Sequence, residues 1–239
     1  MKQHKLHINC DLGEGSKNEV QIMDYIQACN IACGGHFGDS SSIYSTLSKA
    51  VDHELEVGAH PSYPDVENFG RISMHLDKEA FYSSMRNQLD LYFDQLSKFH
   101  IQNNHIKAHG ALYNDLCTND ELCSWFLEVI NPYPFKTLYT PFNGSLAVLA
   151  KKLNIPVSFE AFIDRNYNQE GQLVSRSLPN AEKDSLEAVY EQLESIRLRQ
   201  EVHCIDGTLI PMKADTFCVH GDHSLALVRL QHLKERYFK

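Results

Sequence analysis

The pattern of hydrophobic and polar positions divides this chain into two kinds of segment that follow each other in turn. Short apolar runs of strand length end in glycines, prolines and ionisable residues, and a segment with apolar residues at helical spacing follows each of them. The run 28–33 is typical, because the loop 34–39 after it holds three glycines, His36 and Asp39, and a helical pattern over 40–54 comes next. The repeated order of strand, polar loop and helix predicts an α/β fold.

The same unit recurs along the chain. We expect strands at 5–11, 28–33, 55–59, 105–109, 136–140, 156–162 and 216–219. Helical spacing predicts helices at 18–27, 40–54, 77–96, 119–129, 145–153, 181–198 and 224–237. Between 202–205 and 208–211, the dipeptide Asp206-Gly207 is typical of a two-residue type I′ turn and predicts a hairpin. Strands that are joined through helices are parallel neighbours, so we expect a parallel sheet.

Either an open, doubly wound sheet or a closed barrel would satisfy this order of elements. An open sheet gathers its site at one switch point, whereas a barrel draws on most of its strand ends. In this chain, six of the seven predicted strands end in ionisable residues. We therefore predict a single domain over residues 1–239, folded as a seven-stranded (β/α) TIM-like barrel with a small β-hairpin insertion near 202–211.

The ionisable residues at the strand ends form the candidate site. One strand-end histidine is ordinarily a solvated or capping residue, but ionisable residues at several strand ends favour a shared cleft. Carboxylates and histidines there can act as general bases, and Lys107 and Arg165 can hold a carboxylate or a phosphate. The candidate residues are Asp11, Glu14, His36, Asp39, His60, Lys107, His109, Asp164, Arg165, His220 and Asp222.

Metal chemistry stays open at this level. Asp11, His36, His60 and His109 could hold a divalent metal that activates water, although the chain has no close-spaced metal motif such as His-Glu-x-x-His. The chain also lacks a Gly-x-x-x-x-Gly-Lys-Ser/Thr phosphate loop and a Gly-x-Ser-x-Gly nucleophile elbow. Cys33 ends a predicted strand, where we expect it to be buried rather than reactive.

Composition narrows the class of protein. The formal net charge is −9 and no basic stripe is present, which argues against nucleic acid as a partner. Seven cysteines without a Cys-x-x-Cys pair fit reduced thiols in a cytoplasm better than a disulfide framework. Residues 1–15 lack the apolar core of a signal peptide and no apolar run approaches a membrane span, so we expect a soluble, cytoplasmic protein.

Several blocks of residues, in series along the chain, resemble one known family. The blocks are 9–15 (NCDLGEG), 30–39 (NIACGGHFGD), 58–65 (GAHPSYPD), 69–71 (FGR), 107–114 (KAHGALYN), 164–167 (DRNY) and 218–222 (CVHGD). They are similar to the LamB/YcsF family, the family of the 5-oxoprolinase A subunits, over nearly the whole chain. The family usually has Phe and Ala where this chain has Gly35 and Phe37, so we expect the pocket beside His36 to differ in shape and substrate fit.

The resemblance implies a seven-stranded relative of the glycoside hydrolase/deacetylase barrels. It implies ATP-dependent hydrolysis of the lactam of 5-oxo-L-proline to L-glutamate, with partner subunits B and C handling much of the nucleotide chemistry. We hypothesise that Asp11 or His60 is the general base for water and that His36, His109 and His220 position or protonate the ring nitrogen. The residues expected to bind the substrate are Glu14, Asp39, Lys107, Asp164, Arg165 and Asp222.

Two other functions stay open. One is a metal-dependent amide or N-acetyl hydrolase, which related barrels suggest. The other is a non-catalytic subunit that binds a metabolite or assembles its partners and has no turnover by itself. Assays with and without ATP and partner subunits would separate the three functions.

Overall fold

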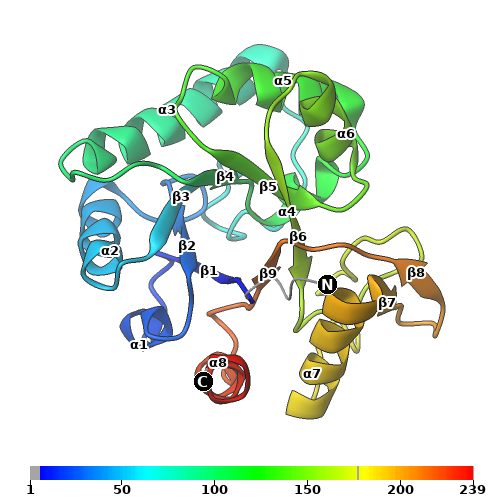
Figure 1. Ribbon diagram of the computed structural model, residues 1–239. Coiled ribbons are helices and arrows are strands. Elements are labelled where there is room, and N and C mark those ends of the chain that lie inside the picture. The colour runs from blue at the N-terminus through cyan, green and yellow to red at the C-terminus, as the bar shows by residue number, and fades with distance from the viewer. Residues whose placement is uncertain (1–5, 177, 239) are drawn as a thin grey trace.

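The structure is a computed structural model that describes residues 6–176 and 178–238. Its central element is a closed barrel of parallel strands. In these residues the strand order is β1-β2-β3-β4-β5-β6-β9, and β9 pairs with both β6 and β1 to close the ring (Figure 1). The strands are β1 (Ile8–Leu12), β2 (Ala28–Ala32), β3 (Glu56–His60), β4 (His105–Lys107), β5 (Thr137–Pro141), β6 (Val157–Phe162) and β9 (Thr216–Cys218). The predicted seven-stranded barrel is confirmed, although Lys5, where we expected the first strand to begin, lies outside the described residues.

Helices follow the strands along the chain and surround the barrel (Figure 1). They are α1 (Glu19–Met23), α2 (Ser40–Asp52), α3 (Lys78–Leu96), α4 (Gly110–Asp115), α5 (Asp120–Ile130), α6 (Ser145–Lys152), α7 (Leu186–Glu194), the π-helical segment η1 (Ser195–Arg199) and α8 (Ala226–Tyr237). The helix expected over 181–198 begins only at Leu186, because the side chain of Ser185 accepts a hydrogen bond from the Ala188 amide and caps it there. Within the described residues, no helix combines the length and apolar character that a membrane span needs.

The helix α4 was not predicted, and it brings a distant loop to the barrel. Its first residue, Gly110, has φ +58°, and a side chain there would lie 2.4 Å from the carbonyl oxygen of Gly70. The Ala111 amide donates to that same oxygen at 2.9 Å. Only glycine fits this close approach, which holds the loop 69–71 against the end of β4.

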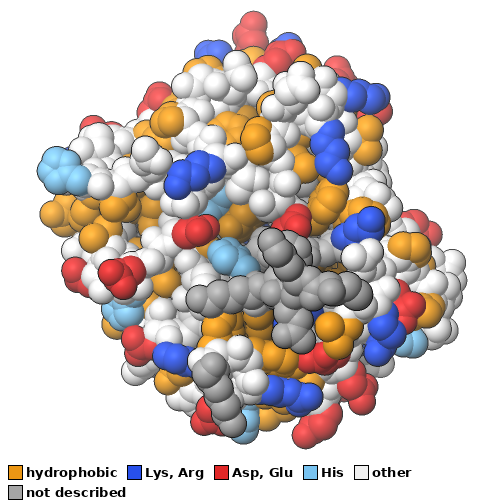
Figure 2. All heavy atoms as spheres, viewed as in Figure 1, with side chains coloured by type: hydrophobic (Ala, Val, Ile, Leu, Met, Phe, Trp, Pro, Cys, Tyr) orange, Lys and Arg blue, Asp and Glu red, His pale blue; other side chains and the backbone are white. Residues whose placement is uncertain are grey.

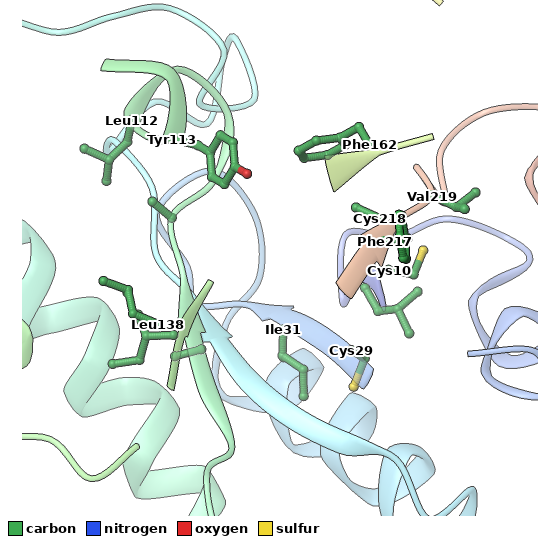
Figure 3. Close-up of a cluster of buried hydrophobic side chains, with 14 of the residues drawn as sticks. Cys10, Cys29, Ile31, Leu112, Tyr113, Leu138, Phe162, Phe217, Cys218 and Val219 are labelled. Carbon is green, nitrogen blue, oxygen red and sulfur yellow. The ribbon is translucent and has the colours of Figure 1, made fainter. Parts of the chain in front are cut away.

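The apolar core lies between the strands and the helices. Successive side chains of a strand point to opposite faces, so every second side chain of each barrel strand points outward into this layer. Figure 3 shows part of it, including Cys29 and Ile31 from β2, Leu138 from β5 and Phe217 from β9, all of which are buried.

The inward side chains are largely polar and hydrogen-bonded to one another. The side-chain amide of Asn9 donates to Thr216 Oγ1 at 2.8 Å, and that of Asn30 donates to Asn9 Oδ1 at 2.8 Å. His105 Nε2 donates to Asn30 Oδ1 at 2.6 Å. Gly58 leaves room for the His105 ring, because a side chain at 58 would lie 2.2 Å from it. This interior network lies directly below the strand ends and fixes the groups that project from them.

The predicted hairpin forms as a separate two-stranded sheet outside the barrel (Figure 1). Its strands are β7 (Glu201–His203) and β8 (Leu209–Pro211), paired antiparallel. The predicted type I′ turn is wrong, because that turn needs positive φ at both central residues, whereas Gly207 has φ +87° and Asp206 has no positive φ. The Gly207 amide instead bonds the carbonyl of Cys204, which gives a three-residue loop with glycine in the left-handed position.

Candidate active site

A cavity of about 540 Å³ opens at the carboxyl ends of the barrel strands. Parallel strands bring their ends to one edge, which is why residues far apart in the sequence share this space. It is lined by Asp11, Glu14, His60, Lys107, His109, Arg165, His220 and Asp222 among the predicted residues. Asp164 lies directly behind His220, whereas His36 and Asp39 do not line the cavity.

One wall of the cavity holds Asp11, Glu14, His60 and His109, which we call the histidine–carboxylate cluster. His60 Nε2 lies 2.9 Å from His109 Nδ1 and 3.3 Å from Asp11 Oδ2. Glu14 Oε1 lies 3.4 Å from His109 Nδ1. One nitrogen or oxygen atom from each of the four residues falls within 4.8 Å of all the others, so the group could hold a metal ion. The sequence prediction of a metal set included His36 in place of Glu14.

His36 lies behind this cluster. Its Nε2 donates to Glu14 Oε1 at 2.9 Å, and its ring stacks on that of His109 with 3.6 Å between centroids. Burial lowers the pKa of His36 despite the opposing effect of the Glu14 carboxylate. The imidazole therefore stays neutral near pH 7 and orients Glu14 and His109 rather than contacting a ligand in the cavity.

Lys107 forms the floor of the cavity. Its ammonium lies 2.8 Å from Asp11 Oδ1 and 3.0 Å from Glu160 Oε1, and it donates to the Cys218 sulfur at 3.3 Å. Burial would lower the pKa of Lys107, but the neighbouring negative groups, Asp11 first, hold it well above the usual range. Burial would likewise raise the pKa of Asp11, but its neighbours His60 and Lys107 hold it well below the usual range. The floor is therefore a charged ion pair at neutral pH.

Glu160 was not predicted as a site residue. It is buried near the end of β6, where Lys107 is its ion-pair partner. The signal was present in the sequence, since the one charged residue of a mostly apolar strand is rarely buried without a charged partner. What the sequence does not contain is the register that places Glu160 opposite Lys107.

The opposite wall holds His220 and Asp164. The carboxylate of Asp164 accepts from the backbone amide of His220 at 2.9 Å and from its Nδ1 at 3.0 Å. Phe162 stacks on the imidazole with 5.0 Å between centroids, and Arg229 Nη1 lies 3.6 Å from Asp164 Oδ2. Burial would raise the pKa of Asp164, but His220 and Arg229 lower it below the usual range. With Nδ1 occupied, Nε2 is the nitrogen that His220 can offer to a ligand.

The expected clamp, Arg165, holds the protein's own backbone. Its Nε donates to the carbonyl of Ala181 at 3.2 Å and its Nη2 donates to that of Val174 at 2.5 Å, which ties down the loop after β6. The cations at the cavity rim are instead Arg71 and Arg176.

Both rim arginines pair with one carboxylate. Arg71 Nη2 lies 2.6 Å and Arg176 Nη1 lies 3.1 Å from Asp222 Oδ2. Asp222, expected to bind substrate directly, therefore positions these two cations. Arg71 belongs to the block 69–71 that carries the family resemblance, whereas no motif pointed to Arg176.

Asp39 has a structural position outside the cavity. Its side chain accepts from the amides of Ser41 and Ser42, each at 2.9 Å, and caps α2. These hydrogen bonds, the one from the Ser41 hydroxyl first, lower the pKa of Asp39. The structure does not bring this predicted substrate-binding residue to the other site residues.

The stretch around His36 differs from the expectation of an altered pocket. Neither Gly35 nor Phe37 lines the cavity. A side chain at Gly35 would lie 2.2 Å from Gln88 Oε1, and the Phe37 ring packs against Gly15. The changes in side-chain size at Gly35 and Phe37 are therefore accommodated outside the cavity. Nearby, Cys33 is buried as expected, and burial raises the pKa of its thiol to about 12.

Comparison with known proteins identifies the family of this chain. The model of the LamB/YcsF family matches residues 6–238. The A subunit of a 5-oxoprolinase from Vibrio cholerae serotype O1 is 34% identical over 98% of both chains, and the one from Thermococcus sibiricus is 35% identical over 97% of this chain and 93% of its own. The crystal structure of a lactam utilization protein from Thermus thermophilus superposes with a TM-score of 0.86 at 28% identity, covering 97% of this chain and 96% of that one. This chain therefore belongs to the LamB/YcsF family.

Proposed function

We propose that this chain is the A subunit of a 5-oxoprolinase, which hydrolyses the lactam of 5-oxo-L-proline to L-glutamate with ATP and partner subunits B and C. The observation that carries the proposal is one cavity with a proton-transfer group on each of two walls and a buried ammonium between them. The relatives named as A subunits of 5-oxoprolinase support the same substrate.

The role of ATP follows from the chemistry of an amide. Resonance with nitrogen makes a lactam carbonyl a poor electrophile, so attack by water needs activation. Transfer of the terminal phosphate of ATP to the carbonyl oxygen would create a good leaving group. Water would then add to that carbon and the carbon–nitrogen bond would break, which leaves the phosphoryl group on the new side-chain carboxyl. A second water would hydrolyse this acyl phosphate to glutamate and phosphate. Because the chain has no phosphate-loop motif, we assign ATP binding largely to the partner subunits.

The two walls of the cavity supply the proton transfers that this reaction needs. His220, oriented by Asp164, can donate a proton to the departing ring nitrogen or accept one from water through Nε2. On the other wall His60 and Asp11 are the candidates for the base. Lys107 places its positive charge where negative charge develops on the carbonyl or phosphate oxygen.

The rim arginines are suited to the carboxylate of the substrate. Arg71 and Arg176 converge on Asp222 Oδ2, so two guanidinium groups are already held together at the cavity mouth. A guanidinium binds a carboxylate through paired hydrogen bonds, and a substrate carboxylate would share these donors with Asp222. This assignment replaces Arg165, whose donors bind the backbone.

Glutamate release by the reconstituted three-subunit complex tests the proposal. We expect turnover only when ATP, 5-oxo-L-proline and both partner subunits are present. Asp11→Asn and His60→Asn should each reduce the rate, because each change keeps a polar group but removes a charge or a base. Near-normal rates in both variants would refute these roles. Amide hydrolysis by the chain alone, without ATP, would instead indicate a metal-dependent amide hydrolase.

The oxidation state of the cysteines indicates the cellular compartment of the protein. All seven are free thiols, and six of them are buried. Free thiols persist in a reducing environment, so we also propose a cytoplasmic location.

A further inference from the structure

We propose that the histidine–carboxylate cluster of Asp11, Glu14, His60 and His109 binds one divalent transition-metal ion. One ligand atom of each residue lies within 4.8 Å of the other three, and each of these atoms can present a lone pair to an ion.

Backbone carbonyls fix the tautomers of both histidines. His60 Nδ1 lies 2.8 Å from the carbonyl oxygen of Lys107, and His109 Nε2 lies 3.0 Å from that of Phe69. A carbonyl only accepts, so both of these nitrogens carry the hydrogen. In a neutral imidazole the other nitrogen then presents a lone pair. Those lone-pair nitrogens, His60 Nε2 and His109 Nδ1, face each other at 2.9 Å.

Two acceptors at this distance require a cation between or beside them. The nearest carboxylate atoms add further lone pairs, with Asp11 Oδ2 at 3.3 Å from His60 Nε2 and Glu14 Oε1 at 3.4 Å from His109 Nδ1. In a tetrahedral site with metal–ligand bonds of about 2.0–2.1 Å, neighbouring ligand atoms lie about 3.3–3.4 Å apart. The nitrogen–oxygen separations match that value.

The groups behind the four residues are arranged as metal ligands require. Metal-bound histidines usually donate their second nitrogen to a backbone carbonyl or carboxylate, as both rings do here. Asp11 Oδ1 accepts from Asn30 at 2.7 Å and from Lys107 at 2.8 Å, which leaves Oδ2 directed at the cluster. His36 donates to Glu14 at 2.9 Å from behind.

Charge balance gives an independent argument. Three carboxyl groups, those of the partly buried Asp11 and Glu14 and of the buried Glu160, gather around the single ammonium of Lys107, so acidic groups outnumber the cation by two. Uncompensated buried charge is costly. A divalent cation cancels both charges, whereas one proton shared between His60 and His109 cancels one. The structure thus favours a metal over a shared proton.

Two nitrogens and two carboxylate oxygens select the class of metal. Imidazole ligands suit Zn²⁺, Mn²⁺, Fe²⁺, Co²⁺ and Ni²⁺, whereas Mg²⁺ and Ca²⁺ prefer oxygen alone. Asp11, Glu14, His60 and His109 all line the cavity, so a bound ion would contact a ligand there. With an ion bound, His60 Nε2 and Asp11 Oδ2 would be its ligands, and the ion would take over from them the activation of water or the lactam carbonyl. That use rests on the proposed function, but the binding of the ion does not.

Metal content of the purified full chain tests the site. The chain should be stripped with chelator, exposed in turn to Zn²⁺, Mn²⁺, Fe²⁺, Co²⁺ and Ni²⁺, desalted and measured by mass spectrometry of the metal. We expect close to one ion per chain for at least one metal, and visible absorption bands from bound Co²⁺. His60→Ala and His109→Ala should each reduce the content at least tenfold. His36→Gln should weaken affinity about 10- to 100-fold, as loss of an outer hydrogen bond does.

The matched control is His220→Ala, which removes a histidine from the same cavity but outside the cluster. It should retain the wild-type metal content. Circular dichroism of every variant establishes that it is folded. Failure of the wild-type chain to bind any of the five metals would overturn the proposal without recourse to variants, and so would equal loss of metal in His220→Ala. Glutamate release decides the proposed function separately, since a chain can bind metal without hydrolysing 5-oxo-L-proline.

Discussion

At the scale of single residues, Asp164 decides what His220 can do. It accepts two hydrogen bonds from His220, through the backbone amide and Nδ1, and a guanidinium lies behind it. Such a contact fixes both the tautomer and the orientation of an imidazole. Sequence patterns placed Asp164 among the substrate-binding residues but could not show that it pairs with His220, because they contain no information on which side chains face each other.

Asp164→Asn should reduce turnover with little change in KM. The amide can donate to Nδ1, which favours the wrong tautomer and removes a compensating charge. We expect kcat of the reconstituted complex to fall about 100-fold or more, in the range that a positioned acid or base contributes. The measurement is ATP-dependent glutamate release, with the exposed Asp94→Asn as a control that keeps the wild-type rate. An unchanged kcat in Asp164→Asn would exclude His220 from proton transfer.

The same residue makes stability depend on pH. The pKa of Asp164 in the folded chain lies below its ordinary value, so the carboxylate stabilises the fold at any pH above the unfolded pKa, about 4. That contribution is lost as the pH falls below about 4. Urea unfolding at pH 3 to 7 should show a steeper acid loss in the free energy of unfolding for wild type than for Asp164→Asn. Parallel curves would show that the ionised form carries no stabilisation.

At the scale of elements, the helices explain why one predicted site residue lies elsewhere. Asp39 precedes α2 and satisfies its first amides, as an N-cap residue does. In sequence, a strand-end acid and an N-cap acid are indistinguishable in a barrel, because every strand-end loop is also the approach to a helix. The distinction depends on where the backbone turns.

Asp39→Ala should destabilise the chain and leave its chemistry intact. Loss of the cap should lower the free energy of unfolding by about 1 kcal/mol, and Asp39→Ser should restore most of it. Thermal or urea unfolding measures the effect, and glutamate release by the complex should retain its KM. A raised KM in Asp39→Ala with unchanged stability would make Asp39 a substrate-binding residue after all.

Strands and helices were largely predictable because their periodicities are local. The positions of Asp11 and His60 at strand ends followed from where apolar runs break, whereas the predicted strand 105–109 ends at Lys107. The closed barrel followed from the ionisable residues at six of the seven predicted strand ends. The helix α4 and the hairpin turn were missed, because each depends on a contact made at a distance or on one backbone angle, such as Gly110 against Gly70. The partners of buried charges, Glu160 above all, depend on strand register and cannot be read from periodicity.

At the scale of the whole molecule, one ammonium links distant parts of the barrel. Lys107 from β4 contacts Asp11 of β1 and Glu160 of β6 across the interior. Figure 2 shows a different distribution on the outside, where Lys and Arg side chains are scattered among acidic ones on the face in view. The ion pairs of Lys107, which join separate strands of the barrel, lie in its interior.

Lys107→Met should be severely destabilising. It leaves the buried carboxylate of Glu160 and the mostly buried one of Asp11 without their cation, and breaking a buried ion pair costs about 3–5 kcal/mol. The exposed pair of Lys98 and Asp94 offers the control, since Lys98→Met should cost less than about 1 kcal/mol. Urea unfolding compares the two. Adding Glu160→Gln to Lys107→Met should recover part of the loss, and a strictly additive double variant would contradict the ion pair.

The polar interior of the barrel limits which substitutions can accumulate during evolution. Asn9, Asn30 and His105 lie below the cavity and hydrogen-bond one another, and Asn30 also holds Asp11. The hydrogen bonds that keep the barrel folded are thus the ones that orient its reactive groups. Selection for folding and selection for chemistry act on the same positions, so natural variants there should be scarce. The mouth of the cavity, where Arg71 and Arg176 are partly exposed, is where lineages are free to diverge in what they bind.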